Sequence, residues 1–472
     1  TLDNLPAGVS RPGYDRRQVE ASIVHLGLGA FHRAHQAWFT EAVLASGDLA
    51  WGIVGAGMQS SGMRDALAPQ DNLYVLSEVG AESQKLSVIG AIVDVVGGAE
   101  DSEKIRLLAK LSDISTRIVS LTVTEKGYYL DLATGQLQLQ APAIAADLAN
   151  PAAPKTILGL IVQALKQRKA AGIPPFTVLS CDNLPNNGKL AKAAVLAYAR
   201  QTDPGLADWI ETHVAFPCTM VDRIVPAATP ETLQEIADQL GVYDPCAIAC
   251  EPFRQWVIED NFVSGRPEWE KAGAELVADV IPFEEMKLRM LNGSHSFLAY
   301  LGYLAGYQHI NDCMEDENYR VAAHALMLHE QAPTLKVKGV DLGHYADLLI
   351  ARYSNPALRH RTWQIAMDGS QKLPQRIFGA IADRVHAGQP FCRLALTVAA
   401  WLRFLLGKSE AGQSYEISDP LAARLGLLAA ESGGDPTLHA KQNGDGWQVK
   451  TADPDDSVGA SVKPAQTGIP YT

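Results

Sequence analysis

The sequence predicts an α/β fold, with a parallel-sheet N-terminal domain and a mainly α-helical C-terminal domain. Residues 23–57 read as strand, glycine-containing turn, helix and strand, which is the order that opens a βαβ unit. After about Pro282, apolar residues recur at i, i+3, i+4 and i+7, the spacing of amphipathic helices. Since 472 residues exceed what one hydrophobic core supports, we expect two domains, residues 1–282 and 283–472.

The N-terminal domain is predicted to be Rossmann-like, because short apolar segments alternate with helical ones. The expected strands are 23–27, 51–57, 73–79, 86–96, 117–124 and 176–181, and the expected helices are 30–46, 102–111 and 156–171. In the C-terminal domain we expect helices at 283–307, 318–335 and 390–407. The segment from about 433 to the end lacks periodicity and is expected to be a loose tail. With no long linker between the domains, we expect the active site in a cleft between them.

The overall charge disfavours polyanionic partners. The formal net charge is -13 and the isoelectric point is about 5.4, so the chain repels phosphate backbones and anionic lipids. No apolar run approaches the roughly 18 residues that span a bilayer, and the N-terminal segment lacks the apolar core of a signal peptide. We therefore expect neither a nucleic-acid nor a membrane partner, and a cytoplasmic location.

The cysteines do not indicate a metal site. Six of them are spread along the chain, too sparsely for a disulfide scaffold, and we expect reduced thiols. Cys246 and Cys250 are spaced CxxxC without a nearby histidine, whereas structural zinc usually takes four Cys or His ligands. We expect no metal.

A glycine-containing turn, Gly27-Leu28-Gly29, lies between the first predicted strand and helix. Backbone N–H groups in such a turn can hold a pyrophosphate. The usual third glycine is replaced by His32, and the second strand ends on Gly57-Met58 without an acid for a ribose 2′-hydroxyl, while Arg64 follows. A nucleotide site and a plain strand-to-helix turn both fit these residues, which do not decide between NAD and NADP.

Three side chains of the segment KLRMLNGSH are candidates for the chemistry, namely Lys287, Asn292 and His295. In an α-helix His295 falls about 80° and Asn292 about 140° around the axis from Lys287, so all three can line one broad side. Desolvation can lower a lysine pKa from about 10.4 toward neutrality, as a general base requires, and asparagine can donate to an oxyanion. An exposed lysine, a structural asparagine and a core histidine fit the same spacing, which leaves that alternative open.

Six ordered segments together resemble the long-chain mannitol dehydrogenase family of polyol and sugar-acid dehydrogenases. They span roughly residues 15–410 and read GLGAFHRAHQAWFTEAVL, SLTVTEKGY, SCDNLPNNG, FPCTMVDRIVPAATP, EPFRQWVIED and KLRMLNGSH. Within the family, residues 219–260 most resemble the branch that interconverts D-fructuronate and D-mannonate. The resemblance therefore implies a dehydrogenase that acts on a small sugar acid or polyol.

The resemblance also implies a catalytic set. Lys287 matches the general acid/base, and Asn183 in SCDN matches, together with Asn292, the asparagines that bind the developing oxyanion. His295 matches a histidine that contacts the reacting hydroxyl or carbonyl. In the reduction, the ammonium of Lys287 is expected to protonate the oxygen of the former keto group.

Two carboxylates are implied in supporting roles. Asp222 in VDR matches a carboxylate near the catalytic lysine, and Glu125 in VTEKGY matches one that moves the proton to solvent. The alternatives are an Asp222 that pairs with Arg223 or a helix end, and a Glu125 that is an ordinary surface carboxylate.

For the coenzyme, the resemblance points to NAD, with NADP not excluded. Gly27, Gly29, Ala30 and Phe31 match the coenzyme loop, and the family tolerates loss of the third glycine, which accounts for His32. The family also leads us to expect a monomer.

A basic island at residues 359–376 is the candidate for binding a substrate carboxylate. It holds four Lys and Arg residues, Arg376 among them, against the single Asp368, and arginine binds carboxylates in a bidentate manner. The residues expected to bind substrate are Arg359, His360, Arg361 and Lys372. A solvated helix face is the alternative.

Other functions are less well supported. The main alternative is a polyol dehydrogenase acting on mannitol, but in such relatives we expect an arginine where this chain has Gln364. A non-catalytic nucleotide-binding protein would not need the Lys–Asn–His set. A zinc alcohol dehydrogenase lacks its ligand spacing here, and neither Tyr129 nor Tyr198 has the lysine four residues on that a short-chain dehydrogenase uses.

Overall fold

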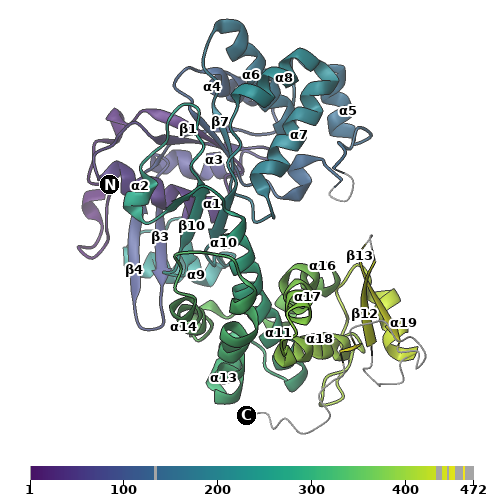
Figure 1. Ribbon diagram of the computed structural model, residues 1–472. Coiled ribbons are helices and arrows are strands. Elements are labelled where there is room, and N and C mark those ends of the chain that lie inside the picture. Colours follow the sequence, from purple (N-terminus) through teal and green to yellow (C-terminus); the bar gives the residue numbers. More distant parts are fainter. Residues whose placement is uncertain (1, 132–134, 432–437, 444–445, 452–460, 463–472) are drawn as a thin grey trace. The chain divides into compact units, whose positions relative to one another are not determined.

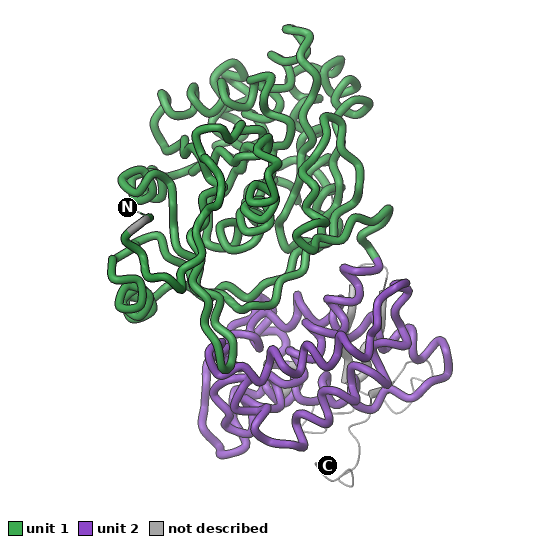
Figure 2. The backbone as a smooth tube through the Cα atoms, turned by 90° about the vertical axis from the view of Figure 1, so that its left-hand side faces the viewer, with its two compact units in different colours: residues 1–281 green, residues 282–472 purple. Residues whose placement is uncertain are grey.

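The computed structural model of the chain describes residues 2–131, 135–431, 438–443, 446–451 and 461–462. The chain forms two compact units, residues 1–281 and 282–472, which Figure 2 shows in green and purple.

A five-stranded parallel sheet lies at the centre of unit 1 (Figure 1). Its order is β5-β2-β1-β6-β7, with bounds Ile92–Gly97, Gly52–Gly57, Ala21–Leu26, Ile118–Leu121 and Thr177–Ser180. The chain runs outward from β1 to one edge and then, from β6, to the other. The strand order therefore reverses between β1 and β6, and in open α/β sheets ligands bind at the carboxyl ends of the strands at such a point.

Both faces of this sheet are buried, because successive residues of each strand point to opposite sides. Val24 belongs to a core shared with helices α4, α6, α7 and α8, whereas its neighbour Ile23 belongs to a core shared with α2 and Trp256. These helices are α2 (Gln36–Ala45), α4 (Asp101–Ser112), α6 (Ile157–Ala171), α7 (Asn187–Thr202) and α8 (Pro204–His213). Burial on both sides explains why the strands read as continuous apolar runs.

Two three-stranded sheets complete unit 1. One has the order β4-β3-β9, with bounds Gln84–Ile89, Tyr74–Val79 and Ile248–Cys250, and the other has the order β11-β10-β8, with bounds Glu275–Val277, Gln255–Glu259 and Thr219–Asp222. Shorter helices of the unit are α1 (Ala30–Ala34), α3 (Gly62–Leu67), α5 (Pro142–Ala149) and α9 (Pro230–Leu240).

The single strand predicted at 86–96 is wrong, since it is two strands in different sheets. β4 pairs antiparallel with β3, and β5 pairs parallel with β2. Between them the Gly90 N–H donates to Glu41 Oε2 at 2.7 Å, and the Gly90 carbonyl accepts from Arg16 Nε at 3.0 Å. Side chains thus provide the hydrogen-bond partners of the Gly90 backbone where the chain passes from one sheet to the other.

Unit 2 is mainly helical. Its α-helices are α10 (Ile281–Met286), α11 (Ser294–Ala305), α12 (Ile310–Glu315), α13 (Glu317–Leu326), α14 (Leu342–Tyr353), α15 (Thr362–Ala366), α16 (Gly369–Leu373), α17 (Gly379–His386), α18 (Cys392–Phe404) and α19 (Ala422–Glu431). Throughout the described part of the chain, no helix combines the length and apolar character that crossing a membrane requires.

Three π-helical segments distinguish unit 2 from the straight α-helices expected there. They are η6 (Lys287–Gly293), η7 (Met327–Gln331) and η10 (Pro374–Phe378), and η6 packs against the other two. The predicted helix at 283–307 is therefore α10, η6 and α11 in succession, and the one at 318–335 is largely α13 followed by η7. The helix predicted at 30–46 is similarly interrupted at His35.

The loose tail expected after residue 433 is wrong where the structure describes it. There β12 (Leu438–Asn443) and β13 (Gly446–Thr451) form an antiparallel hairpin, and β14 (Ser461–Val462) pairs with β12. The rest of that predicted tail lies outside the described residues. The predicted class, a Rossmann-like N-terminal domain followed by a mainly helical C-terminal domain, is confirmed.

Candidate active site

The turn after β1 has a backbone conformation that requires glycine. Gly27 has φ +105°, a conformation that favours glycine, and a Cβ there would overlap the Thr122 carbonyl oxygen. A Cβ on Gly29 would meet only Gly27 O, at 3.8 Å, and Gly29 is exposed. Ala30 and Phe31 follow as the first residues of α1 and are half-buried. The turn therefore leaves room at Gly29 for an anionic group such as a pyrophosphate.

His32 occupies the position of the third glycine, and its side chain packs against β1. Its ring stacks on His25 of β1 with centroids 3.4 Å apart, and its Nδ1 lies 3.1 Å from Gln36 Oε1. His25 in turn bonds to Gly27 O at 3.1 Å and to Thr122 Oγ1 at 2.8 Å. The third glycine of the usual motif permits close helix–strand packing, and here two stacked imidazoles fill that space beneath the turn.

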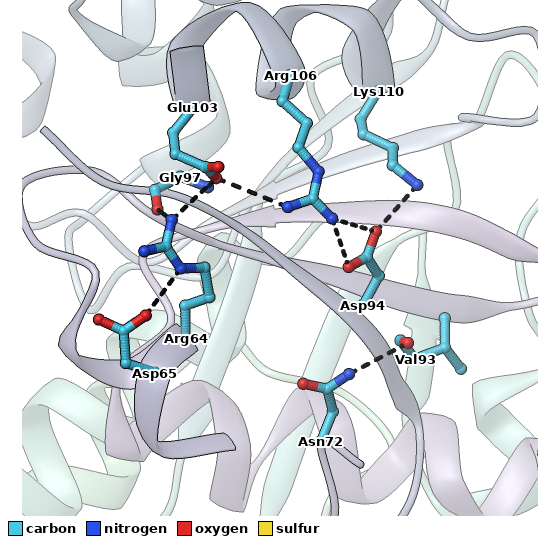
Figure 3. Close-up of polar contacts among 9 residues, drawn as sticks. All are labelled: Arg64, Asp65, Asn72, Val93, Asp94, Gly97, Glu103, Arg106 and Lys110. Atoms are coloured by element: carbon cyan, nitrogen blue, oxygen red, sulfur yellow. Dashed lines mark hydrogen bonds and ion pairs between the residues drawn. The ribbon is translucent and has the colours of Figure 1, made fainter. Parts of the chain in front are cut away.

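At the end of β2, where a coenzyme ribose would be bound, Arg64 is held by two carboxylates (Figure 3). Its Nε lies 3.0 Å from Asp65 Oδ1 and its Nη1 lies 3.2 Å from Glu103 Oε2. Glu103 also accepts from the Gly97 N–H at 2.9 Å. Since its charge is already paired, Arg64 is poorly placed to bind a 2′-phosphate.

The segments carrying Glu125 and Asn183 meet where β6 and β7 end. The Asp182 carboxylate accepts from the backbone N–H groups of Val123 and Thr124, both at 2.8 Å, and from the Tyr128 hydroxyl at 2.6 Å. These bonds hold Thr124 at φ +62°, an unusual backbone angle for a β-branched residue. Burial raises the pKa of the Asp182 carboxyl, and the negative charge of Glu125 adds to the effect. Both Glu125 and Asn183 are exposed.

Asn187 links this loop to the strand that carries Asp222. Its buried amide donates to Asp182 O and to Thr219 O, both at 2.9 Å, and accepts from Thr219 N at 2.9 Å. Thr219 begins β8, which ends on Asp222, and Asp222 is only 6% exposed. The neighbouring Arg223 directs its guanidinium to Glu78 and to the carbonyls of Ala34 and Glu251.

In unit 2, the π-helical turn brings Lys287 and Asn292 onto one face of their helix. A π-helix bonds residue i to i+5, so two residues five apart lie about one turn from each other, instead of about 140° apart as in an α-helix. Lys287 is 7% exposed and Asn292 is half-buried. The exposed lysine weighed as an alternative is therefore wrong.

His295 lies at the start of α11 in a buried aromatic setting. Its ring stacks on Tyr353 with centroids 4.9 Å apart, and His360 lies at 5.2 Å. The Tyr353 hydroxyl donates to Leu291 O at 2.8 Å. Burial lowers the pKa of His295 well below its usual value, and the positive charges of nearby residues lower it further, so the ring is neutral at neutral pH.

The residues of the basic island differ in their exposure to solvent. Arg359 and Arg361 are exposed, whereas His360, Lys372 and Arg376 are half-buried. The Lys372 amine donates to Met367 O at 2.7 Å, and Arg376 Nη1 donates to Ser296 Oγ at 3.2 Å. That the candidate residues of units 1 and 2 face one cleft stays a prediction.

The sheet order and the glycine turn at its switch point are those of a dinucleotide-binding fold. Comparison with known proteins narrows this class. The chain matches the mannitol dehydrogenase Rossmann domain over residues 21–271 and the mannitol dehydrogenase C-terminal domain over residues 279–442. This chain therefore belongs to the mannitol dehydrogenase family, as the sequence motifs indicated, and it is an oxidoreductase that acts on CH–OH groups.

Individual relatives cover nearly all of the chain. It is 57% identical to a D-mannonate oxidoreductase of Escherichia coli over 91% of this chain and 88% of that protein. It is 42% identical to a mannitol 2-dehydrogenase of Phaeosphaeria nodorum, over 90% of this chain and 76% of that protein. The solved Pseudomonas fluorescens mannitol 2-dehydrogenase, a ternary complex with NAD and D-mannitol, is 42% identical with a TM-score of 0.79, covering 92% of this chain and 88% of that one.

Three residues next to the predicted site residues Asn183 and His295 were not predicted from the sequence. Asp182 is a buried acid directly after a strand, and its position beside Asn183 in SCDN is a usable signal. Arg352 and Tyr353 belong to an ordinary amphipathic helix, α14, and nothing in their local pattern indicates that they face His295.

We predict that Glu103→Gln tightens NADPH binding by roughly three- to fivefold and leaves NADH binding nearly unchanged. Glutamine keeps an acceptor for the Gly97 N–H but removes one of the two charges that hold Arg64. The dissociation constants are measured by quenching of protein fluorescence.

Asp94→Asn is the matched control for this change. Asp94 lies in the same group but binds Arg106 at 3.1 Å and Lys110 at 3.0 Å, away from Arg64 (Figure 3). Equal effects of the two variants on NADPH binding would contradict the role given to Arg64.

We also predict that stability falls as the pH drops below about 6.5. Burial lowers the pKa of His25 to about 3 and lowers those of His32, His295 and His360, so the unfolded chain takes up protons that the folded chain does not bind. Each such group contributes up to about 1.4 kcal/mol per pH unit.

The measurement is urea unfolding between pH 5.5 and 7.5. His295→Asn should flatten the pH slope, and the exposed His386→Asn should leave it unchanged. A wild-type stability that is independent of pH in this range is the outcome that rules the prediction out.

Proposed function

We propose that this protein is a fructuronate reductase, which interconverts D-fructuronate and D-mannonate with NAD(H). The support for the substrate is the 57% identity to a D-mannonate oxidoreductase over 91% of the chain. The support for the coenzyme is the 42% identical relative that was solved with NAD, together with the open turn at Gly29 and the paired charge of Arg64.

The observation that carries the proposed chemistry is the burial of Lys287 on the same π-helical turn as Asn292. A buried amine gives up its proton more readily than an exposed one, because desolvation disfavours the ammonium. An amide one turn away can hold the oxygen with which that proton is exchanged.

The bound coenzyme supplies the hydride in reduction and accepts it in oxidation. During reduction, the Lys287 ammonium transfers a proton from Nζ to the oxygen of the former keto group, and the lysine is left neutral. The amides of Asn183 and Asn292 donate hydrogen bonds to that oxygen while it carries negative charge. During oxidation, neutral Lys287 accepts the hydroxyl proton as the hydride leaves.

The remaining residues orient the substrate and exchange the proton. His295 is neutral, so its ring both donates and accepts and can fix one substrate hydroxyl. Asp222, at the buried end of β8, stabilises the ammonium form of Lys287. Exposed Glu125 passes the proton between the lysine and solvent. The backbone N–H groups of Ala30 and Phe31 at the start of α1 would hold the coenzyme's pyrophosphate, and Gly27 and Gly29 would keep the turn open for it.

Oxidation of a neutral polyol is the second candidate function, because the chain is also 42% identical to mannitol 2-dehydrogenases. The experiment that separates the two is a panel of keto-uronates and ketohexoses assayed with NADH and NADPH. We expect the highest kcat/KM with D-fructuronate and NADH. A preference for fructose would make the protein a polyol dehydrogenase instead.

We predict that Lys287→Ala lowers kcat by several orders of magnitude while the dissociation constant for NADH stays within about twofold. In the wild type, the pH optimum for oxidation should lie above that for reduction, because the lysine must be neutral in one direction and protonated in the other. Turnover is measured by NADH absorbance in both directions across pH.

Lys271→Ala is the control, since Lys271 is exposed and paired with Glu268. It should leave both the rate and the pH profiles unchanged. Near-normal turnover of Lys287→Ala would remove the general acid/base from the proposal.

A further inference from the structure

Positive charge gathers around His295 from three separate elements of unit 2. After burial, the His295 pKa is lowered by the neighbouring His360 and by the positive charges of Arg376, Arg352 and Lys372. Arg352 lies on α14, Lys372 on α16 and Arg376 on η10. In a chain with a formal net charge of -13, this is a local reversal of sign.

The charge of Arg376 is less compensated than that of Lys372. Its described polar contact is the neutral hydroxyl of Ser296, at 3.2 Å from Nη1. Among the described residues, no Asp or Glu lies within ion-pair distance of it, and the groups that act on it electrostatically are the Tyr300 and Tyr353 hydroxyls. By contrast, Lys372 has Asp368 at 4.0 Å.

The backbone of η10 brings Arg376 close to the segment that carries the catalytic candidates. A Cβ on Gly293 would lie 2.9 Å from Arg376 O, so this approach depends on a glycine between Asn292 and Ser294. The Ser296 hydroxyl that accepts from Arg376 itself donates to Asn292 O at 3.0 Å. One hydroxyl thus connects the guanidinium to the backbone of the proposed oxyanion-binding residue.

Desolvation of a half-buried guanidinium costs free energy unless an anion pairs with it. The planar guanidinium fits a carboxylate in a bidentate manner. A sugar acid carries such a group at the end of its carbon chain opposite the reacting carbon. A neutral polyol has no anionic group that could pair with the guanidinium.

We propose that Arg376 binds the carboxylate of the sugar-acid substrate. Lys372 and Arg352 add positive potential at the same place. This inference rests on the proposed function and changes the residues expected from the sequence, because Arg359 and Arg361 are exposed.

The test compares Arg376→Met with the wild type on D-fructuronate and on neutral fructose, with NADH. We predict a loss of about 10- to 100-fold in kcat/KM for D-fructuronate, mainly through KM, and an unchanged or higher value for fructose. Unchanged fluorescence quenching by NADH shows that the variant is folded. Arg403→Met is the matched control, because Arg403 pairs with Glu410 elsewhere in unit 2 and should leave both substrates unaffected.

Two further measurements do not depend on how well Arg376→Met folds. Arg376→Lys keeps the charge but not the fork, so its loss on D-fructuronate should be intermediate and again confined to KM. The wild type should oxidise D-mannonate better than the neutral D-mannonamide, and Arg376→Met should lose that discrimination.

The outcomes separate this inference from the proposed function. If the wild type does not reduce D-fructuronate, the proposed function itself fails. If it does, but Arg376→Met loses activity equally on both substrates or on neither, then Arg376 is not the carboxylate-binding residue.

Discussion

Burial of the Lys287 side chain is the constraint on which the proposed active site depends. An ammonium ion loses much of its hydration in such a place, and the protein must compensate with oriented polar groups. The π-helical turn brings the Asn292 amide to the same side of the helix as this lysine. The turn in turn depends on close packing against η10, which Gly293 permits by lacking a side chain. The position of Lys287 relative to Asn292 therefore depends on how this segment packs against η10.

Most of the fold could be predicted from the sequence, because hydrophobic period and glycine placement report on local structure. The first strand and turn and the helical character of unit 2 follow from such patterns. The division of residues 86–96 between two sheets could not be predicted, since it depends on Glu41 and Arg16, which bind Gly90 from distant positions. The π-helical turn was missed for the same reason: its apolar spacing resembles that of an α-helix, and tertiary packing decides between them.

The candidate site shows the same division between local and distant information. Lys287, Asn292 and His295 stand within nine residues and were found as a motif, and burial of the lysine contradicts the exposed lysine of the alternative. The basic island was visible as composition, but composition does not say which arginine turns inward. Tertiary contacts make this distinction. Arg376 contacts Ser296, and Arg352 of α14 acts on His295, whereas Arg359 and Arg361 are exposed.

Within one family, neutral and acidic substrates can share the same proton-transfer residues if recognition of the substrate's far end is separate from the chemistry. Discrimination of this kind is asymmetric. A site built around an uncompensated cation rejects a neutral analogue strongly, because the charge is left without a partner, whereas a neutral site rejects an extra charge only through desolvation. A single inward arginine beside a neutral histidine is thus enough to shift preference toward a sugar acid without altering Lys287 or Asn292. On this argument, substrate class in this protein is decided on η10 and proton transfer on η6, two packed segments that can vary separately.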